Sequence, residues 1–151
     1  MGNWSHRRFR KFYQSQVEQI FALLDKQFRH GQVSYDAYLE LCDQTGVEPN
    51  RDDMPPTAAD YPFEVQVAFL LHDLMPDRWD GMNGVHMGKD MSVLGTLLDT
   101  YEIKDRRTVI FFIKHIEARY TNKLNAEAKQ KQEASKRRAK AGTKPGINVQ
   151  G

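Results

Sequence analysis

Apolar and polar residues are arranged along most of this chain with the three-to-four-residue spacing of amphipathic helices. From Phe9 to Phe28 the apolar positions follow one another in such steps, and Gly31 stands where a left-handed helix end favours glycine. Ser34 is a suitable N-cap for a second, shorter helix. The pattern predicts an N-terminal helical hairpin over residues 5–46.

A proline- and acid-rich linker follows at residues 47–61, where the prolines favour extended, irregular backbone. The next segment, FEVQVAFLLHDLM over residues 63–75, is apolar on nearly every side. A helix that is apolar all round is a buried one, so this segment is predicted to be the central helix of the core. Pro76 follows its end.

Two more helices are predicted after the glycine-rich segment MPDRWDGMNGVHMGKDM (residues 75–91). Asp90 is a suitable cap for a leucine-rich helix, and Asp105 for a long last helix whose apolar stripe ends at Leu124. Strong helix formers continue beyond that residue without apolar positions, which predicts a solvent-exposed helical extension.

The sequence therefore predicts an all-α protein of about five helices, since no segment of useful length has the two-residue period of a strand. We expect one helical domain over residues 1–122, made of the hairpin, the linker and core helices over 62–122. Residues 123–151 are expected to form a basic helical extension and a flexible tail.

Charge is distributed unevenly along the 151 residues. Residues 1–11 hold four Lys/Arg and no acid, and residues 123–151 hold eight Lys/Arg and two Glu, whereas residues 12–122 have ten basic and eighteen acidic residues. An acidic body disfavours nucleic acid on the folded core, and the basic ends suit phosphates or an acidic partner. No eighteen-residue apolar run and no apolar leader core are present, so we expect a soluble intracellular protein without membrane contact.

The residues that carry chemistry form no catalytic pattern. Cys42 is the only cysteine and is expected to be a small buried residue on a helix. The five histidines lack the spacing of a metal site, and His72 is expected to be a hydrogen-bonded core residue. A calcium loop around Gly31 has no carboxylate at its ligand positions. These observations predict a protein that is not an enzyme and has no metal or cofactor.

The glycine-rich segment fails the tests for a phosphate-binding loop. A P-loop ending at Gly88–Lys89 needs glycine at position 83 and Ser or Thr at position 90, but Asn83 and Asp90 stand there. The dinucleotide-binding glycine spacing is also missing. We interpret the segment as a structural turn between two core helices, in which Trp79 either packs into the core or faces a partner.

Apolar side chains on a glycine-rich loop are difficult to bury within the same chain, and methionines suit adaptable binding surfaces. The residues predicted to bind a partner are Trp79, Met82, Val85, His86 and Met87. The basic tail residues are Lys136, Arg137, Arg138 and Lys140. No aromatic residue is interleaved with them to stack on bases, which favours a solvated helix or a protein contact over nucleic acid.

Several features follow one another over about residues 50–120: a buried helix, Pro76–Asp77–Arg78–Trp79, a glycine-rich turn, Gly88–Lys89–Asp90 and a leucine-rich helix. This order resembles the small helical tail assembly chaperones of tailed bacteriophages. The resemblance implies a non-enzymatic protein of the host cytoplasm that binds the tape-measure protein. It does not account for the N-terminal hairpin.

Two alternatives remain open. The chain is a phage virion structural subunit whose basic ends wrap neighbouring copies or other subunits, or it is a nucleic-acid-binding accessory protein that acts through its basic tail. If the chain is a virion subunit, it is also expected to be able to associate with copies of itself.

Overall fold

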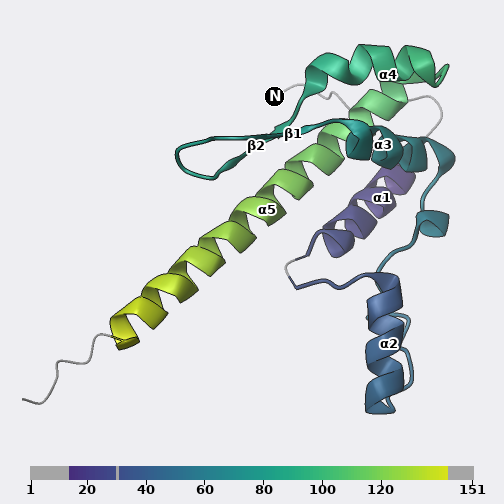
Figure 1. The fold of residues 1–151 in the computed structure, drawn as a ribbon. Coiled ribbons are helices and arrows are strands. Elements are labelled where there is room, and N and C mark those ends of the chain that lie inside the picture. The colour runs from purple at the N-terminus through teal and green to yellow at the C-terminus, as the bar shows by residue number, and fades with distance from the viewer. Residues whose placement is uncertain (1–13, 30, 143–151) are drawn as a thin grey trace, which may run out of the picture.

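The computed structural model describes residues 14–29 and 31–142, and this part of the chain is mostly helical (Figure 1). Its α-helices are α1 (Gln14–Gln27), α2 (Tyr35–Thr45), α3 (Phe63–Leu74), α4 (Leu94–Thr100) and α5 (Arg106–Gly142). Two short 3-10 turns, η1 (Ala58–Asp60) and η2 (Met91–Val93), and a two-stranded sheet, β1 (Asp77–Trp79) and β2 (His86–Lys89), complete it. The predicted class and the five helices are confirmed; residues 5–13 of the predicted hairpin lie outside the described residues.

The core forms where α3 packs against the first half of α5, with α1 lying along α5 on another side. Phe21 of α1 lies 6.0 Å from Phe111 of α5, ring centre to ring centre. The buried cluster draws on α1, α3, α4 and α5, on Tyr61 shortly before α3 and on Met75 directly after it. Its members are Ile20, Leu24, Tyr61, Val65, Ala68, Leu71, Met75, Leu98, Val109, Phe112, Ile113 and Ile116.

Polar residues begin the helices as the sequence predicts. The Ser34 hydroxyl accepts a hydrogen bond from the Ala37 amide at 3.3 Å. Asp90 accepts one from the Ser92 amide at 3.0 Å at the start of η2 and α4, and Asp105 one from the Thr108 amide at 3.3 Å at the start of α5. Each cap satisfies an amide that has no partner inside its own helix.

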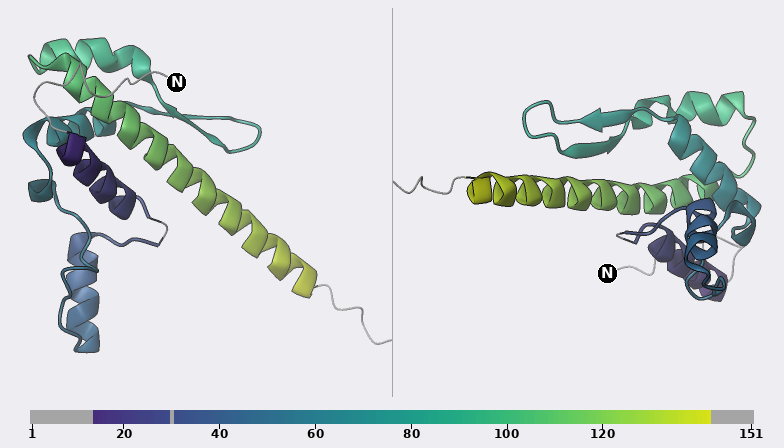
Figure 2. Two further views of the ribbon diagram at one scale, coloured as in Figure 1. Left: turned by 180° about the vertical axis from the view of Figure 1, so that it is seen from behind. Right: turned by 60° about the horizontal axis from the view of Figure 1, so that its bottom comes forward.

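The predicted packing of the N-terminal hairpin is wrong, because α2 points away from the body instead of lying along α1 (Figures 1 and 2). The linker after α2 folds back beside it, and the Tyr38 hydroxyl accepts a hydrogen bond from the Asn50 amide at 3.0 Å. Cys42 is buried on α2, as expected. One buried residue gives α2 too little apolar surface to hold it against α1.

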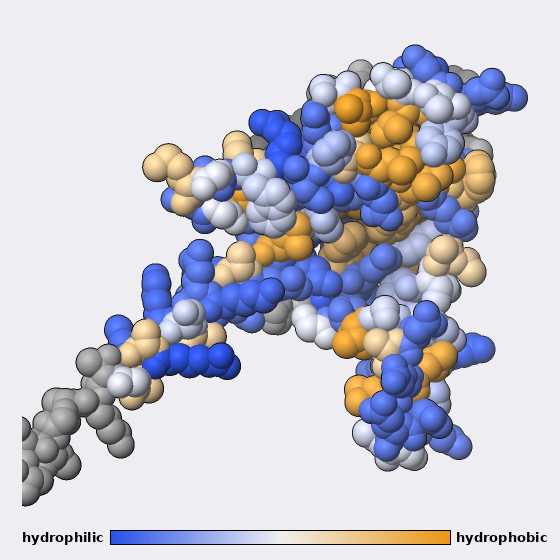
Figure 3. Space-filling model, viewed as in Figure 1, coloured by the Kyte–Doolittle hydropathy of each residue, from blue (hydrophilic) through white to orange (hydrophobic). Residues whose placement is uncertain are grey.

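The central helix α3 is buried on only part of its surface. Val65, Ala68 and Leu71 are fully buried, whereas Phe63, Leu70 and Leu74 are exposed by 74%, 47% and 45%. The prediction of a helix buried on all sides is therefore wrong for one face. Figure 3 shows the apolar area on the side of the molecule that carries α3.

The glycine-rich segment, interpreted from the sequence as a structural turn between two core helices, forms a β-hairpin. β1 and β2 run antiparallel, with Asp77 opposite Lys89 and Trp79 opposite His86, and the register is irregular between these pairs. Strands of three and four residues are too short to show a two-residue period in the sequence, which is why the pattern predicted no strand.

The last helix, α5, has 37 residues, so it is about 55 Å long at 1.5 Å per residue. Its first half lies in the core, and its second half projects from the body with a largely hydrophilic surface (Figures 1 and 3). The four tail residues Lys136, Arg137, Arg138 and Lys140 are exposed on it. The expected helical extension is present as far as Gly142.

We expect Gly88→Ala to destabilise the fold by about 2 kcal/mol or more, since strain and overlap both act there. Gly88 has a φ of +92°, and an added Cβ would overlap the Glu117 carboxylate. Gly84→Ala is the matched control, because Gly84 has a φ of +64° with open space around it. Urea unfolding of both variants measures the difference, and equal losses would show that the contact with Glu117 is unimportant.

Candidate protein-binding site

The hairpin loop is a defined structure held by its own hydrogen bonds. The Asp80 amide donates to the Val85 carbonyl and the Gly84 amide to the Asp80 carbonyl, both at 2.9 Å. The Asp80 carboxylate accepts from the Met82 amide at 3.0 Å and from the Asn83 side chain at 2.8 Å. The hydrogen bond from the Met82 amide is the main cause that lowers the pKa of Asp80.

This loop presents apolar side chains to solvent. Met82 is exposed by 94%, Met87 by 56%, Trp79 by 51% and Val85 by 44%. We call these four residues the apolar hairpin surface. Methionine and tryptophan are well suited to binding other proteins, which makes these four residues the candidate binding site.

Trp79 both packs against the hairpin and faces solvent. Its ring meets the His86 ring edge-on, with centres 4.8 Å apart, while half of the side chain stays exposed. Trp79 therefore does not pack into the main core, and its outer face is available to a partner.

His86, the fifth residue of the predicted set, is buried rather than exposed. It is exposed by only 2%, so the expectation that its side chain faces a partner is wrong. Its Nε2 lies 2.7 Å from Asp77 and its Nδ1 3.0 Å from the Thr121 hydroxyl. The Gly88 amide donates to the same Nδ1 at 3.3 Å, so Nε2 carries the proton that is donated to Asp77.

Asn125 of α5 holds the backbone of the hairpin at the same residue. Its side-chain oxygen accepts from the His86 amide at 2.9 Å, and its side-chain nitrogen donates to the His86 carbonyl at 3.2 Å. This pair of bonds imitates the pairing of a neighbouring strand. An α-helix thereby supplies a third partner to a sheet of only two strands.

Glu117 makes the second attachment between the hairpin and the core. One of its oxygens accepts from the Lys89 amide at 2.6 Å, and the other lies 2.6 Å from His72 Nε2 on α3. The prediction that His72 is a hydrogen-bonded core histidine is confirmed. Burial lowers the pKa of His72 more than Glu117 raises it, so the ring is neutral at pH 7.

Lys89 of β2 and Asp77 of β1 form an ion pair where the hairpin meets α5. Lys89 Nζ lies 3.3 Å from Asp77 and 5.2 Å from the centre of the Tyr120 ring. Partial burial raises the pKa of Asp77, but hydrogen bonds from His86 and Lys89 outweigh it and hold the pKa below its ordinary value. Every buried side-chain polar atom in the described part of the chain has a hydrogen-bond partner.

The order Asp77–His86–Thr121 is that of a carboxylate, an imidazole and a hydroxyl, which is the order of a nucleophilic triad. Here both ring nitrogens of the buried His86 are occupied within the chain, so a substrate cannot reach the imidazole. Within residues 14–29 and 31–142, no group of three or more His, Cys, Asp or Glu residues is placed to hold a metal ion. The arrangement serves to position the hairpin.

Sequence reasoning identified the exposed residues but missed their support. The missed residues are Asp77, Lys89, Glu117, Tyr120, Thr121 and Asn125. Glu117, Thr121 and Asn125 follow one another in steps of four, so they lie on one face of α5. A polar row of this kind on a core helix is the signal that could have shown a polar contact there.

A cavity of about 390 Å³ lies between the hairpin loop and α5. It is lined by Asn83, Gly84, Val85, Asn125, Ala128, Lys129 and Gln132. Four of these seven residues, Asn83, Asn125, Lys129 and Gln132, have polar side chains.

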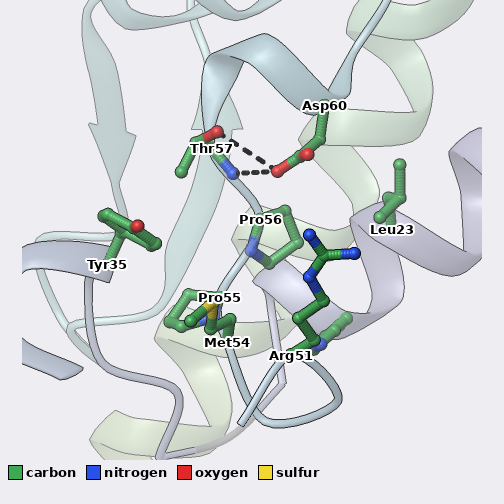
Figure 4. Close-up of a pocket in the computed structure, with 9 residues that line it drawn as sticks. Leu23, Tyr35, Arg51, Met54, Pro55, Pro56, Thr57 and Asp60 are labelled. Carbon is green, nitrogen blue, oxygen red and sulfur yellow. Dashed lines mark hydrogen bonds between the residues drawn. The ribbon is translucent and has the colours of Figure 1, made fainter. Parts of the chain in front are cut away.

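A second cavity, of about 440 Å³, lies between α1 and the linker (Figure 4). Pro55, Pro56 and Leu23 line it together with the side chain of Arg51, and the Thr57 amide donates to Asp60 at 2.7 Å at its edge. The Thr57 hydroxyl donates to the same carboxylate at 3.2 Å.

Comparison with protein-family models, curated proteins and solved structures finds no match for this chain. The resemblance to phage tail assembly chaperones therefore depends on the sequence pattern alone. Among the described helices, none is long and apolar enough to cross a bilayer.

We expect Asn125→Ala to loosen the hairpin, because the buried His86 amide loses its acceptor at a cost of about 1–3 kcal/mol. Faster hydrogen exchange at His86 and Gly88, without a comparable change in the core of α5, is the expected result. Asn122→Ala is the matched control on the exposed side of the same helix. Unchanged exchange at His86 would contradict the role of Asn125.

Stability should fall as the pH is lowered below the ordinary histidine pKa of 6.5. Between that value and the lowered folded pKa of His72, the unfolded chain binds a proton that the folded chain does not, which costs up to about 1.4 kcal/mol per pH unit. His72→Gln should flatten this slope in denaturant unfolding at several pH values.

His115 should contribute to the same pH dependence of stability, because burial lowers its pKa as well. The double variant with His115→Gln should flatten the slope further. A slope unchanged by both substitutions would contradict the neutral state of these rings.

Proposed function

We propose that this protein is a non-enzymatic assembly factor that holds an apolar helical segment of a protein partner. The observation that carries the proposal is the apolar hairpin surface: Trp79, Met82, Val85 and Met87 are each exposed on a hairpin whose backbone is held by Asn125 of α5. A loop that is already ordered loses little conformational entropy on binding, so its apolar area contributes to affinity.

The sequence resemblance suggests the biological setting of this activity. We propose a phage tail assembly chaperone-like role in the host cytoplasm, with the tape-measure protein as the helical partner. A long helical protein exposes apolar stripes until it is assembled, and a methionine-rich surface can adapt to several of them.

The exposed second half of α5 favours a second candidate, a virion structural subunit. From Ala126 to Gly142 this helix holds six Lys/Arg and two Glu, and it projects from the body (Figure 2). A basic rod of this kind suits an acidic surface of a neighbouring subunit. Mass spectrometry of purified particles tests this candidate: presence at stoichiometric copy number favours a subunit, and absence favours an assembly factor.

Nucleic acid is the remaining candidate ligand for the exposed, basic second half of α5. Binding to phosphates would weaken steeply with salt and would vanish when residues 129–151 are deleted. Salt-independent binding, or no binding, would remove this candidate.

The assembly-factor proposal predicts that Trp79→Ala with Met87→Ala weakens co-purification with a tape-measure protein. Central apolar residues of an interface cost about 2 kcal/mol or more each, so we expect the two substitutions together to lower the affinity roughly several hundred-fold. Leu41→Ala with Val47→Ala is the matched control, because these residues are exposed by 53% and 61% on and after α2.

Circular dichroism would show that both double variants keep their helices. If the hairpin variant is folded and binds the partner as well as the control does, the assignment of this site is wrong.

A further inference from the structure

The face of α5 that lines the cavity beside the hairpin continues outward as a row of lysines. Four residues of α5, among them Asn125, Lys129 and Gln132, line this cavity together with the hairpin loop. Lys136 and Lys140 continue the series in steps of four. Residues three or four positions apart lie on one face of a helix, so Lys129, Lys136 and Lys140 share the face that meets the hairpin. We call these three residues the lysine row.

The lysine row presents positive charge to solvent. All three side chains are exposed, and within residues 14–29 and 31–142 no ion pair neutralises any of them. Beyond Asn125 the acids of α5 are Glu127 and Glu133. At 3.6 residues per turn, Glu127 lies on the opposite side of the helix and Glu133 at the edge of the face that carries the row. The row is therefore a predominantly cationic surface.

The hairpin adds apolar side chains at one end of the lysine row. Val85 lines the cavity together with Lys129, and Met82 in the same loop is exposed by 94%. The hairpin extends along α5 in the direction in which this helix leaves the body (Figure 2). A ligand that lies along this face of α5 therefore meets apolar groups at the hairpin and ammonium groups beyond them.

An acidic amphipathic helix of a protein partner fits this face better than a nucleic acid does. The lysines are seven and four positions apart, and a helix beside α5 can present carboxylates at the same spacing, because both rise by about 1.5 Å per residue. Phosphates gain nothing from Val85 and Met82, and α5 has no aromatic residue after Tyr120 to stack on bases. Glu133 beside the row repels phosphates as well.

We infer that the partner binds as an acidic amphipathic helix, with apolar residues on Met82 and Val85 and carboxylates over the lysine row. This inference rests on the proposed function and adds to it the charge of the partner and its course along α5. The hairpin contributes affinity through apolar contact, and the lysine row selects an acidic partner over a basic one.

Two synthetic helical peptides provide the probe. Both carry the same leucines in their first half, and their second half carries either glutamates or lysines at the spacing of the lysine row. Fluorescence anisotropy of the labelled peptides measures their affinity for the full-length protein. We expect the glutamate peptide to bind more tightly than the lysine peptide, with an affinity that falls as salt is added, because salt screens exposed ion pairs.

Lys129→Gln with Lys136→Gln should lower the affinity for the glutamate peptide about fivefold at low salt, since each exposed ion pair contributes modestly. Lys131→Gln with Arg138→Gln is the matched control, because it removes the same charge at the same spacing on the opposite side of α5. All four side chains are exposed, and glutamine forms helices nearly as well as lysine and arginine, so both double variants should keep their fold.

The hairpin variant Trp79→Ala with Met87→Ala separates this inference from the proposed function. If it loses the glutamate peptide while both charge variants bind as the unmodified protein does, the hairpin is the binding site and the inference about the lysine row is wrong. If it binds normally while Lys129→Gln with Lys136→Gln does not, the row selects acids but the hairpin site of the proposed function is wrong.

Two further results would overturn the inference. Equal affinities for the glutamate and lysine peptides would show that the lysine row selects nothing. A single-stranded DNA oligonucleotide that binds more tightly than the glutamate peptide, and that loses affinity in the variant with Lys129→Gln and Lys136→Gln, would assign the row to nucleic acid.

Discussion

The attachment of the hairpin to α5 is the interaction on which the proposed site depends. A hairpin of three and four residues has too little pairing of its own to persist in water. Asn125 completes the backbone pairing at His86, and Glu117 accepts from Lys89 one strand length away. Two polar side chains from one helix therefore fix both ends of β2. Their hydrogen bonds determine where the residues of the apolar hairpin surface lie.

The polar character of this contact has a physical reason. An apolar contact would have buried Trp79 and Met87, whereas hydrogen bonds through the backbone and His86 hold the hairpin and leave those side chains outside. Burying His86 and Lys89 is tolerable only because each polar atom is paired. The hairpin is thus attached to α5 through hydrogen bonds, while about half of the Trp79 and Met87 side chains stays exposed.

Capping residues and apolar spacing within short segments predicted the helices well, but they predicted poorly how the helices pack against one another. Ser34, Asp90 and Asp105 act as caps because capping depends on residues two or three positions apart. The direction of α2 and the exposed face of α3 depend on which elements meet in space, and residue spacing within one helix does not contain that information. The exposed residues of the hairpin followed from composition, but the burial of His86 required partners 35 and 39 residues away.

Because α5 is one uninterrupted helix, no hinge lies between the part of α5 that holds the hairpin and its basic second half. No proline occurs from Arg106 to Ala141, and no glycine until Gly142 ends the helix. Asn125, beneath the hairpin, and Lys140 are therefore held about 22 Å apart at 1.5 Å per residue. A ligand in contact with both the hairpin and the basic second half of α5 would have to present its apolar and acidic groups at about this spacing.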